Sequence, residues 1–210
     1  YFNPGDKNRQ TKFKDAVDET FSLIKKSIDF VPKNSLIQVL PINNLSLESP
    51  ILCKIELAET NLIGEPIGGR GIADEEALEI RLNLCKKVIF KQKMDTVTDI
   101  TGALRKAVYL SDSQAMSDDY RTIIIISDYE EFRGKNTIFE GEEKLDLNNF
   151  KFLLVYASKY TKKKGNKTIK IDPRQQAEKF SEKLKSWGAK KVFIGLEDSN
   201  FSDKMLKKIF

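Results

Sequence analysis

Hydrophobic side chains recur along the chain at two spacings, and the change of spacing separates expected helices from expected strands. Steps of three and four predict amphipathic helices over 11–31, 74–90, 100–108, 173–187 and 201–209. Short apolar or alternating runs predict strands over 35–40, 51–58, 121–127, 150–157 and 191–196. The alternation within 51–58 is typical of a more exposed strand, at an edge or in an antiparallel pair.

The most hydrophobic run lies within Arg121–Glu131 and contains four consecutive isoleucines, Ile123–Ile126. Because such a segment is apolar on both faces, it predicts a strand in the middle of a covered, mostly parallel sheet. Polar and acidic residues follow it at once: Ser127, Asp128, Glu130 and Glu131. Open α/β sheets bind ligands at the carboxyl ends of their strands, so we expect any site to lie near Asp128.

The alternation of strands and helices predicts an α/β fold. We expect a three-layer, mostly parallel, doubly wound sheet with helices on both faces, connected by right-handed crossovers. A length of 210 residues suits one such domain and is short for two, so a single domain over 1–210 is predicted.

Composition excludes several classes of function. No apolar run is long enough to cross a bilayer, so no membrane association is expected. The net charge of +5 is too small an excess to predict nucleic-acid binding. The chain has no histidine, which excludes His-dependent triads and His-ligated zinc, so any metal must be held by oxygen ligands. Cys53 and Cys85 have apolar neighbours, and we expect them to be small core residues rather than a disulfide.

Two segments before helices need separate interpretation. Thr98 and Asp99 precede the helix that starts at Ile100, so either can cap it. The glycine-rich loop within 64–71 also precedes a helix, but its spacing matches neither nucleotide-binding pattern. We therefore interpret that loop as a simple connection rather than a phosphate-binding loop.

Three pieces of the sequence together resemble a von Willebrand factor type A domain, also called an integrin I-like domain. Thr98-Asp99-Ile100 is similar to the family's threonine loop, and Ile123–Asp128 with Glu130 is similar to its fourth strand. Residues 187–196 and 206–209 resemble its last strand and helix. The resemblance implies a magnesium ion at the carboxyl edge of the sheet, with Thr98 and Asp128 among its ligands. It also implies another protein as partner, which supplies a carboxylate to the metal.

The family's first strand and its Asp-x-Ser-x-Ser loop are missing from the sequence. That strand would lie between 35–40 and 121–127, so two buried strand edges should lack a neighbour. We expect residues before Tyr1 to supply it; a second chain, or a variant fold that closes the gap, are the alternatives. The segment Asp198–Ser202 imitates the missing loop, but it fits the start of the last helix and is interpreted as a cap.

A protein-binding module with a magnesium site is therefore the first functional hypothesis, and no enzymatic activity is expected. A metal-dependent phosphoester hydrolase using Asp128, Glu130 and Glu131 is the alternative. A weak nucleic-acid binder acting through the lysine-rich loop Lys162–Lys170 is the second alternative.

Overall fold

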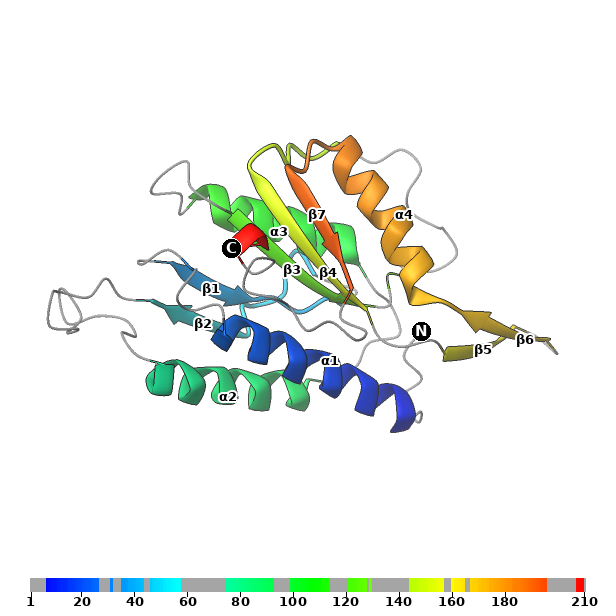
Figure 1. Cartoon of the computed structure of the whole chain (residues 1–210), viewed down its shortest axis with the longest axis horizontal. Helices are drawn as coiled ribbons and strands as arrows, with labels where there is room; N and C mark the ends of the chain where they lie inside the picture. The colour runs from blue at the N-terminus through cyan, green and yellow to red at the C-terminus, as the bar shows by residue number, and fades with distance from the viewer. Residues whose placement is uncertain are drawn as a thin grey trace, which may run out of the picture.

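A computed structural model shows a mixed α/β fold built on a parallel sheet (Figure 1). It describes residues 7–26, 31, 35–43, 46–57, 75–92, 99–113, 121–127, 129, 144–156, 160–164, 167–195 and 207–209. The helices are α1 (Lys7–Lys26), α2 (Glu75–Lys91), α3 (Ile100–Ser113) and α4 (Pro173–Ser186). The strands are β1 (Leu36–Val39), β2 (Cys53–Glu56), β3 (Arg121–Ser127), β4 (Phe150–Tyr156), β5 (Tyr160–Lys164), β6 (Lys167–Ile171) and β7 (Lys191–Ile194). The helices predicted over 11–31, 74–90, 100–108 and 173–187 and the five predicted strands are present, with bounds shifted by a few positions. Of the helix predicted over 201–209, only 207–209 are described, and they are helical; 201–206 lie outside the described residues.

The parallel sheet has the strand order β3-β4-β7. The prediction that 121–127 occupies the middle is wrong for the described residues, because β4 has neighbours on both sides and β3 has one. Burial follows this order. Phe152, Leu153, Leu154 and Val155 of β4 are each 0% exposed, whereas three of the four isoleucines of β3 are only partly buried. Four isoleucines in a row predicted a strand covered on both faces, and that pattern carries no information about its edges.

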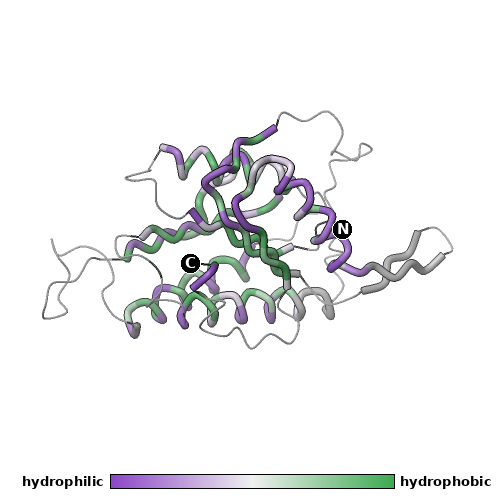
Figure 2. The backbone as a smooth tube through the Cα atoms, turned by 45° about the horizontal axis from the view of Figure 1, so that its top comes forward, coloured by the Kyte–Doolittle hydropathy of each residue, from purple (hydrophilic) through white to green (hydrophobic). Residues whose placement is uncertain are grey.

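Helices cover both faces of β4, as alternate side chains show. Phe152 and Leu154 belong to a core cluster with residues of α3 and α4. Leu153 and Val155 belong to another cluster with residues of α1 and with Ile209 near the end of the chain. Figure 2 shows hydrophobic residues along the strands and an alternation of hydrophobic and hydrophilic residues along the helices. The expected α/β class is therefore confirmed at this level.

The first two strands form a separate sheet. β1 and β2 pair antiparallel, with Ile37 opposite Ile55, and this confirms the antiparallel option for 51–58. Within β2, Ile55 is 2% exposed, while Lys54 and Glu56 on either side are exposed. No strand ladder joins β1 to β3 within the described part of the chain, so the β1–β2 sheet and the parallel sheet are separate there.

A layer of two helices lies under these strands. Val17, Phe21 and Ile24 of α1 are spaced by four and three residues and are 1%, 6% and 7% exposed. They share a core cluster with Leu78 and Leu82 of α2 and with side chains of β1, β2 and β3. This cluster therefore joins the β1–β2 sheet to the β3-β4-β7 sheet through packing.

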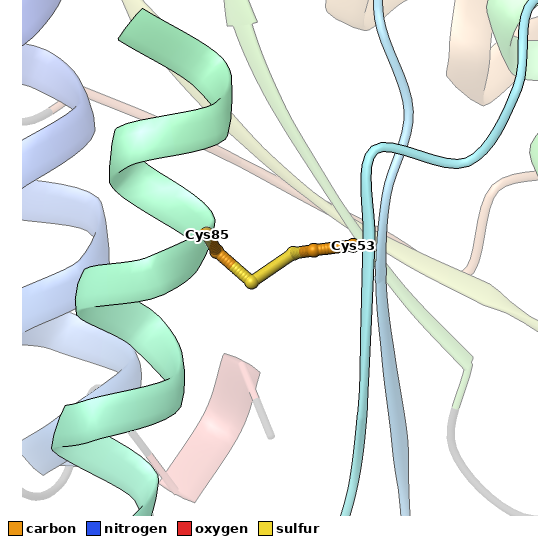
Figure 3. The surroundings of a disulfide bond; sticks show 2 residues. All are labelled: Cys53 and Cys85. Carbon is orange, nitrogen blue, oxygen red and sulfur yellow. A yellow bond between two sulfur atoms is a disulfide. The ribbon is translucent and has the colours of Figure 1, made fainter.

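A disulfide between Cys53 and Cys85 links β2 to α2, with a Cα–Cα distance of 5.7 Å (Figure 3). The expectation of two unlinked core cysteines is therefore wrong. The bridge forms because the apolar face of α2 packs directly on β2. The two residues are 32 positions apart in sequence, and that separation does not indicate their proximity.

The lysine-rich segment predicted as a loop is a hairpin. β5 and β6 pair antiparallel from Tyr160↔Ile171 to Lys164↔Lys167, and the hairpin projects from the end of the fold where β4 ends (Figure 1). It leads into α4, whose predicted start is confirmed: the carboxylate of Asp172 accepts a hydrogen bond from the Arg174 N–H at 3.1 Å. The predicted end of this helix at residue 187 is also confirmed to within one position, and Gly188 follows it with φ +94°.

Candidate functional site

The carboxyl end of β3 turns sharply between Ser127 and Tyr129. The hydroxyl oxygen of Ser127 accepts a hydrogen bond from the Tyr129 N–H at 3.1 Å. Tyr129 has φ +57°, a left-handed conformation that a non-glycine residue adopts at a cost of roughly 1–2 kcal/mol. A residue stays in this conformation when its surroundings fix it, and such strain is often found at functional sites.

The side chain of Tyr129 supplies this fixation. It is 3% exposed and folds back over the sheet, where its hydroxyl lies 2.7 Å from the Ile125 carbonyl oxygen and 2.9 Å from the Val155 carbonyl oxygen. Its ring lies 5.7 Å from that of Phe180 in α4. A single residue thus connects β3, β4 and α4, and the turn after β3 is held rigidly against the core.

The amino end of α3 lies at the same edge of the sheet. Ile100, its first residue, is 1% exposed and belongs to the core cluster that contains Tyr129. Asp99 caps the helix, because its carboxylate accepts a hydrogen bond from the Gly102 N–H at 2.8 Å. The capping interpretation is therefore confirmed for Asp99. The start of α3 and the residue after β3 therefore contribute to the same buried cluster.

The loop after β1 is attached to α3. The Asp99 N–H donates to the carbonyl oxygen of Asn43 at 3.2 Å, and the hydroxyl of Ser46 lies 2.8 Å from the same oxygen. The ammonium group of Lys106, further along α3, donates to the carbonyl oxygens of Leu47 and Ser49. These bonds fix the β1 loop beside the amino end of α3, so three segments meet at this edge.

The residues predicted as metal ligands, Thr98 and Asp128, lie outside the described residues, as do Glu130 and Glu131 of the hydrolase hypothesis. Their neighbours Asp99, Ser127 and Tyr129 are described and lie at the carboxyl edge. Within the described ranges, no group of three or more Asp, Glu, Cys or His side chains is close enough to hold a metal ion. The residues of the glycine-rich loop and of Asp198–Ser202 are likewise outside them.

Two features of this edge were not found by sequence reasoning. Nothing in the sequence indicates that Tyr129 turns back into the core, since its partners belong to β4 and α4. The contact between Asn43 and Asp99 joins segments far apart in the chain and has no local signal either. Only the turn at Ser127 has a local sequence signal, because a serine hydroxyl often accepts a hydrogen bond from the backbone N–H two residues further on.

A second polar feature lies near the amino end of β4. Lys151 is only 6% exposed, and burial lowers the pKa of its ammonium group, with further lowering by the positive charges of Lys191 and Lys190. Lys151 stands opposite Lys191 in the β4–β7 ladder, which explains that repulsion.

No helix in the part of the chain that the structure describes is long and apolar enough to span a membrane. Comparison with known proteins gives no relative: no family model matches the chain, and no curated protein does. No solved structure matches it either.

Proposed function

We propose that this chain is a protein-binding module of the von Willebrand factor type A kind, which binds a partner protein at the carboxyl edge of its sheet. The observation that carries the proposal is that the start of α3 and the residue after β3 both pack into one buried cluster, through Ile100 and Tyr129. Thr98 and Asp128 are within two positions of these residues in sequence. A rigid turn at one end and a capped helix at the other give such a site a fixed frame.

The finer fold assignment belongs to the same proposal. A three-layer, doubly wound sheet of this kind is supported by helices on both faces of β4 and by the parallel order β3-β4-β7. It is also supported by the separation of β1 from β3 among the described residues, the position at which the resemblance has its missing strand.

A magnesium ion is the cofactor of the proposed site. The side chains of Thr98 and Asp128 would hold it, because a small hard cation prefers hydroxyl, carboxylate and water oxygens. The described side chains at this edge suit that chemistry. Ser127 offers a hydroxyl, and Asp99 offers a carboxylate that already accepts a hydrogen bond from the Gly102 N–H. When bound, the ion would offer a coordination position to a carboxylate of the partner.

Thermal unfolding with and without magnesium tests the cation site. For a dissociation constant of about 1 mM, about 10 mM magnesium stabilises the folded chain by about 1.4 kcal/mol, or roughly 3–6 °C in Tm. We expect Asp128→Ala and Thr98→Ala to abolish this shift. Asp146→Ala is the matched control, because Asp146 is an exposed aspartate just before β4, at the opposite end of the strand.

The same variants separate this proposal from the hydrolase. If magnesium still raises the Tm of both Asp128→Ala and Thr98→Ala, the cation does not bind at the proposed edge. Turnover of phosphate esters with magnesium or manganese, lost in Asp128→Asn, would favour the hydrolase instead. We expect no turnover in that screen.

A further inference from the structure

The outer face of α2 carries a row of hydrophobic side chains. Ile80, Leu84 and Val88 are 56%, 48% and 37% exposed, whereas Leu78 and Leu82 on the inner face are 0% and 4% exposed. The three exposed residues are spaced by four positions, so they form one continuous ridge along the helix, which we call the α2 row. Single exposed apolar residues are common on protein surfaces, but a contiguous group of them is typical of an interaction surface.

The orientation of α2 is fixed by contacts on its other sides. The disulfide of Cys85 ties the helix to β2. The ammonium group of Lys25 in α1 lies 2.6 Å from the Glu79 carboxylate, and that of Lys86 lies 2.9 Å from the carboxylate of Asp18 in α1. Figure 1 shows α2 at the lower boundary of the molecule, beside α1. The helix therefore cannot rotate to bury the α2 row against its own core.

Charged residues beside the α2 row differ between the two ends of the helix. Glu76 lies four positions before Ile80 and continues the row at its amino end. Lys87 and Lys91 belong to the neighbouring row and flank the carboxyl end, and Arg81 lies on the other flank, nearer the middle. All four charged residues are exposed. The surface is thus acidic at its amino end and basic over the rest of its length.

This distribution of charge is complementary to itself when two copies of α2 pack antiparallel. A twofold axis at Leu84 places Ile80 of one copy against Val88 of the second copy, because both are four positions from the axis. The same axis brings Glu76 of each copy near Lys91 of the other, so two opposite-charge pairs form. A parallel arrangement would instead place Glu76 beside Glu76 and Lys91 beside Lys91. The charges therefore favour a second copy of this chain in the antiparallel orientation.

We propose that the α2 row is the contact surface of a homodimer, in which two copies of α2 pack antiparallel around Leu84. One pair of helices covers less area than a standard interface of about 1,600 Å², so the dimer is weak, with a dissociation constant on the order of 100 µM. The dimer surface needs no metal ion. It therefore does not depend on the proposed function, and a negative result with magnesium leaves it unaffected.

Sedimentation equilibrium of the oxidised chain between about 5 and 500 µM tests the proposal. The average mass should rise from 24.0 kDa toward twice that value. Leu84→Glu places two carboxylates at the twofold axis and should weaken the association at least about tenfold. Tyr109→Ser is the matched control, because Tyr109 is an apolar residue of α3 that is 71% exposed. It should leave the association unchanged.

Exchange of the charges tests the antiparallel orientation. Glu76→Lys or Lys91→Glu alone places like charges together twice in each dimer, and either should weaken the association by about three- to tenfold. The double variant Glu76→Lys with Lys91→Glu restores both pairs with their signs reversed. Its dissociation constant should return to within about twofold of the original value. Circular dichroism gives the helix content of each variant, and these exposed positions should leave it unchanged.

Three results would overturn the proposal. The first is a mass that stays at 24.0 kDa up to about 500 µM, because the α2 row then binds no second copy. The second is an association that Leu84→Glu does not weaken, which would assign the contact to another surface. The third is a double charge variant that associates no more tightly than the single variants, since antiparallel packing requires the recovery.

Discussion

Opening the Cys53–Cys85 disulfide should destabilise the fold by an amount that follows from the length of the loop it closes. The two cysteines are 32 positions apart. In the chain-entropy description, a crosslink of this separation removes enough freedom from the unfolded chain to contribute about 3.7 kcal/mol. For a chain of this size, that loss corresponds to a decrease in Tm of roughly 7–15 °C.

The measurement is thermal and urea unfolding of the chain with and without dithiothreitol. Mass spectrometry after thiol alkylation gives the state of the bridge: no label before reduction and two labels after it. The variant Cys53→Ala with Cys85→Ala is the matched control. It should have the lower stability from the outset and should not respond to dithiothreitol.

The location of the bridge adds a second expectation. Because it ties β2 to α2, its loss should first reduce the exchange protection of the β1–β2 sheet, for example at Ile55, and only later that of Leu153 in β4. Two alkyl labels on the oxidised chain, or an unchanged Tm after complete reduction, would refute this account of the bridge.

Three further changes test separate parts of the fold. Tyr129→Phe removes a buried hydroxyl that bonds to two strand carbonyls, so we expect a loss of about 1–2 kcal/mol in urea unfolding and a smaller magnesium shift. Lys151→Met should raise Tm at neutral pH, whereas Lys191→Met, at an exposed position, should change it less. The folded-state pKa of Lys151 is below the unfolded value of 10.5. At pH values between these two pKa values, the unfolded chain therefore binds more protons than the folded chain. Native stability should therefore rise as pH increases toward 10.5, and Lys151→Met should lack this rise. Gly188→Ala places a side chain at φ +94°, where its Cβ would clash with the Asn148 Oδ1, and should cost about 1–2 kcal/mol by chemical denaturation.

The local sequence determined most of the elements of this protein. Periodic side chains such as Val17, Phe21 and Ile24 define the buried face of α1, because a helix repeats every 3.6 residues whatever it packs against. Asp172 and Gly188 define the ends of α4 for similar reasons, since a side-chain cap and a left-handed residue act within one turn.

Tertiary structure alone decided how these elements are joined. The hydrophobic pattern of β3 does not indicate which of its edges has a neighbouring strand. Side-chain hydrophobicity indicates which faces of a strand are buried, whereas the neighbours at its edges are set by backbone hydrogen bonds. The disulfide between Cys53 and Cys85 and the inward turn of Tyr129 likewise depend on residues distant in sequence. The candidate site divides in the same way. Thr98 and Asp128 were proposed from the sequence, whereas the burial of Ile100 and Tyr129 in one cluster requires the packing of the whole core.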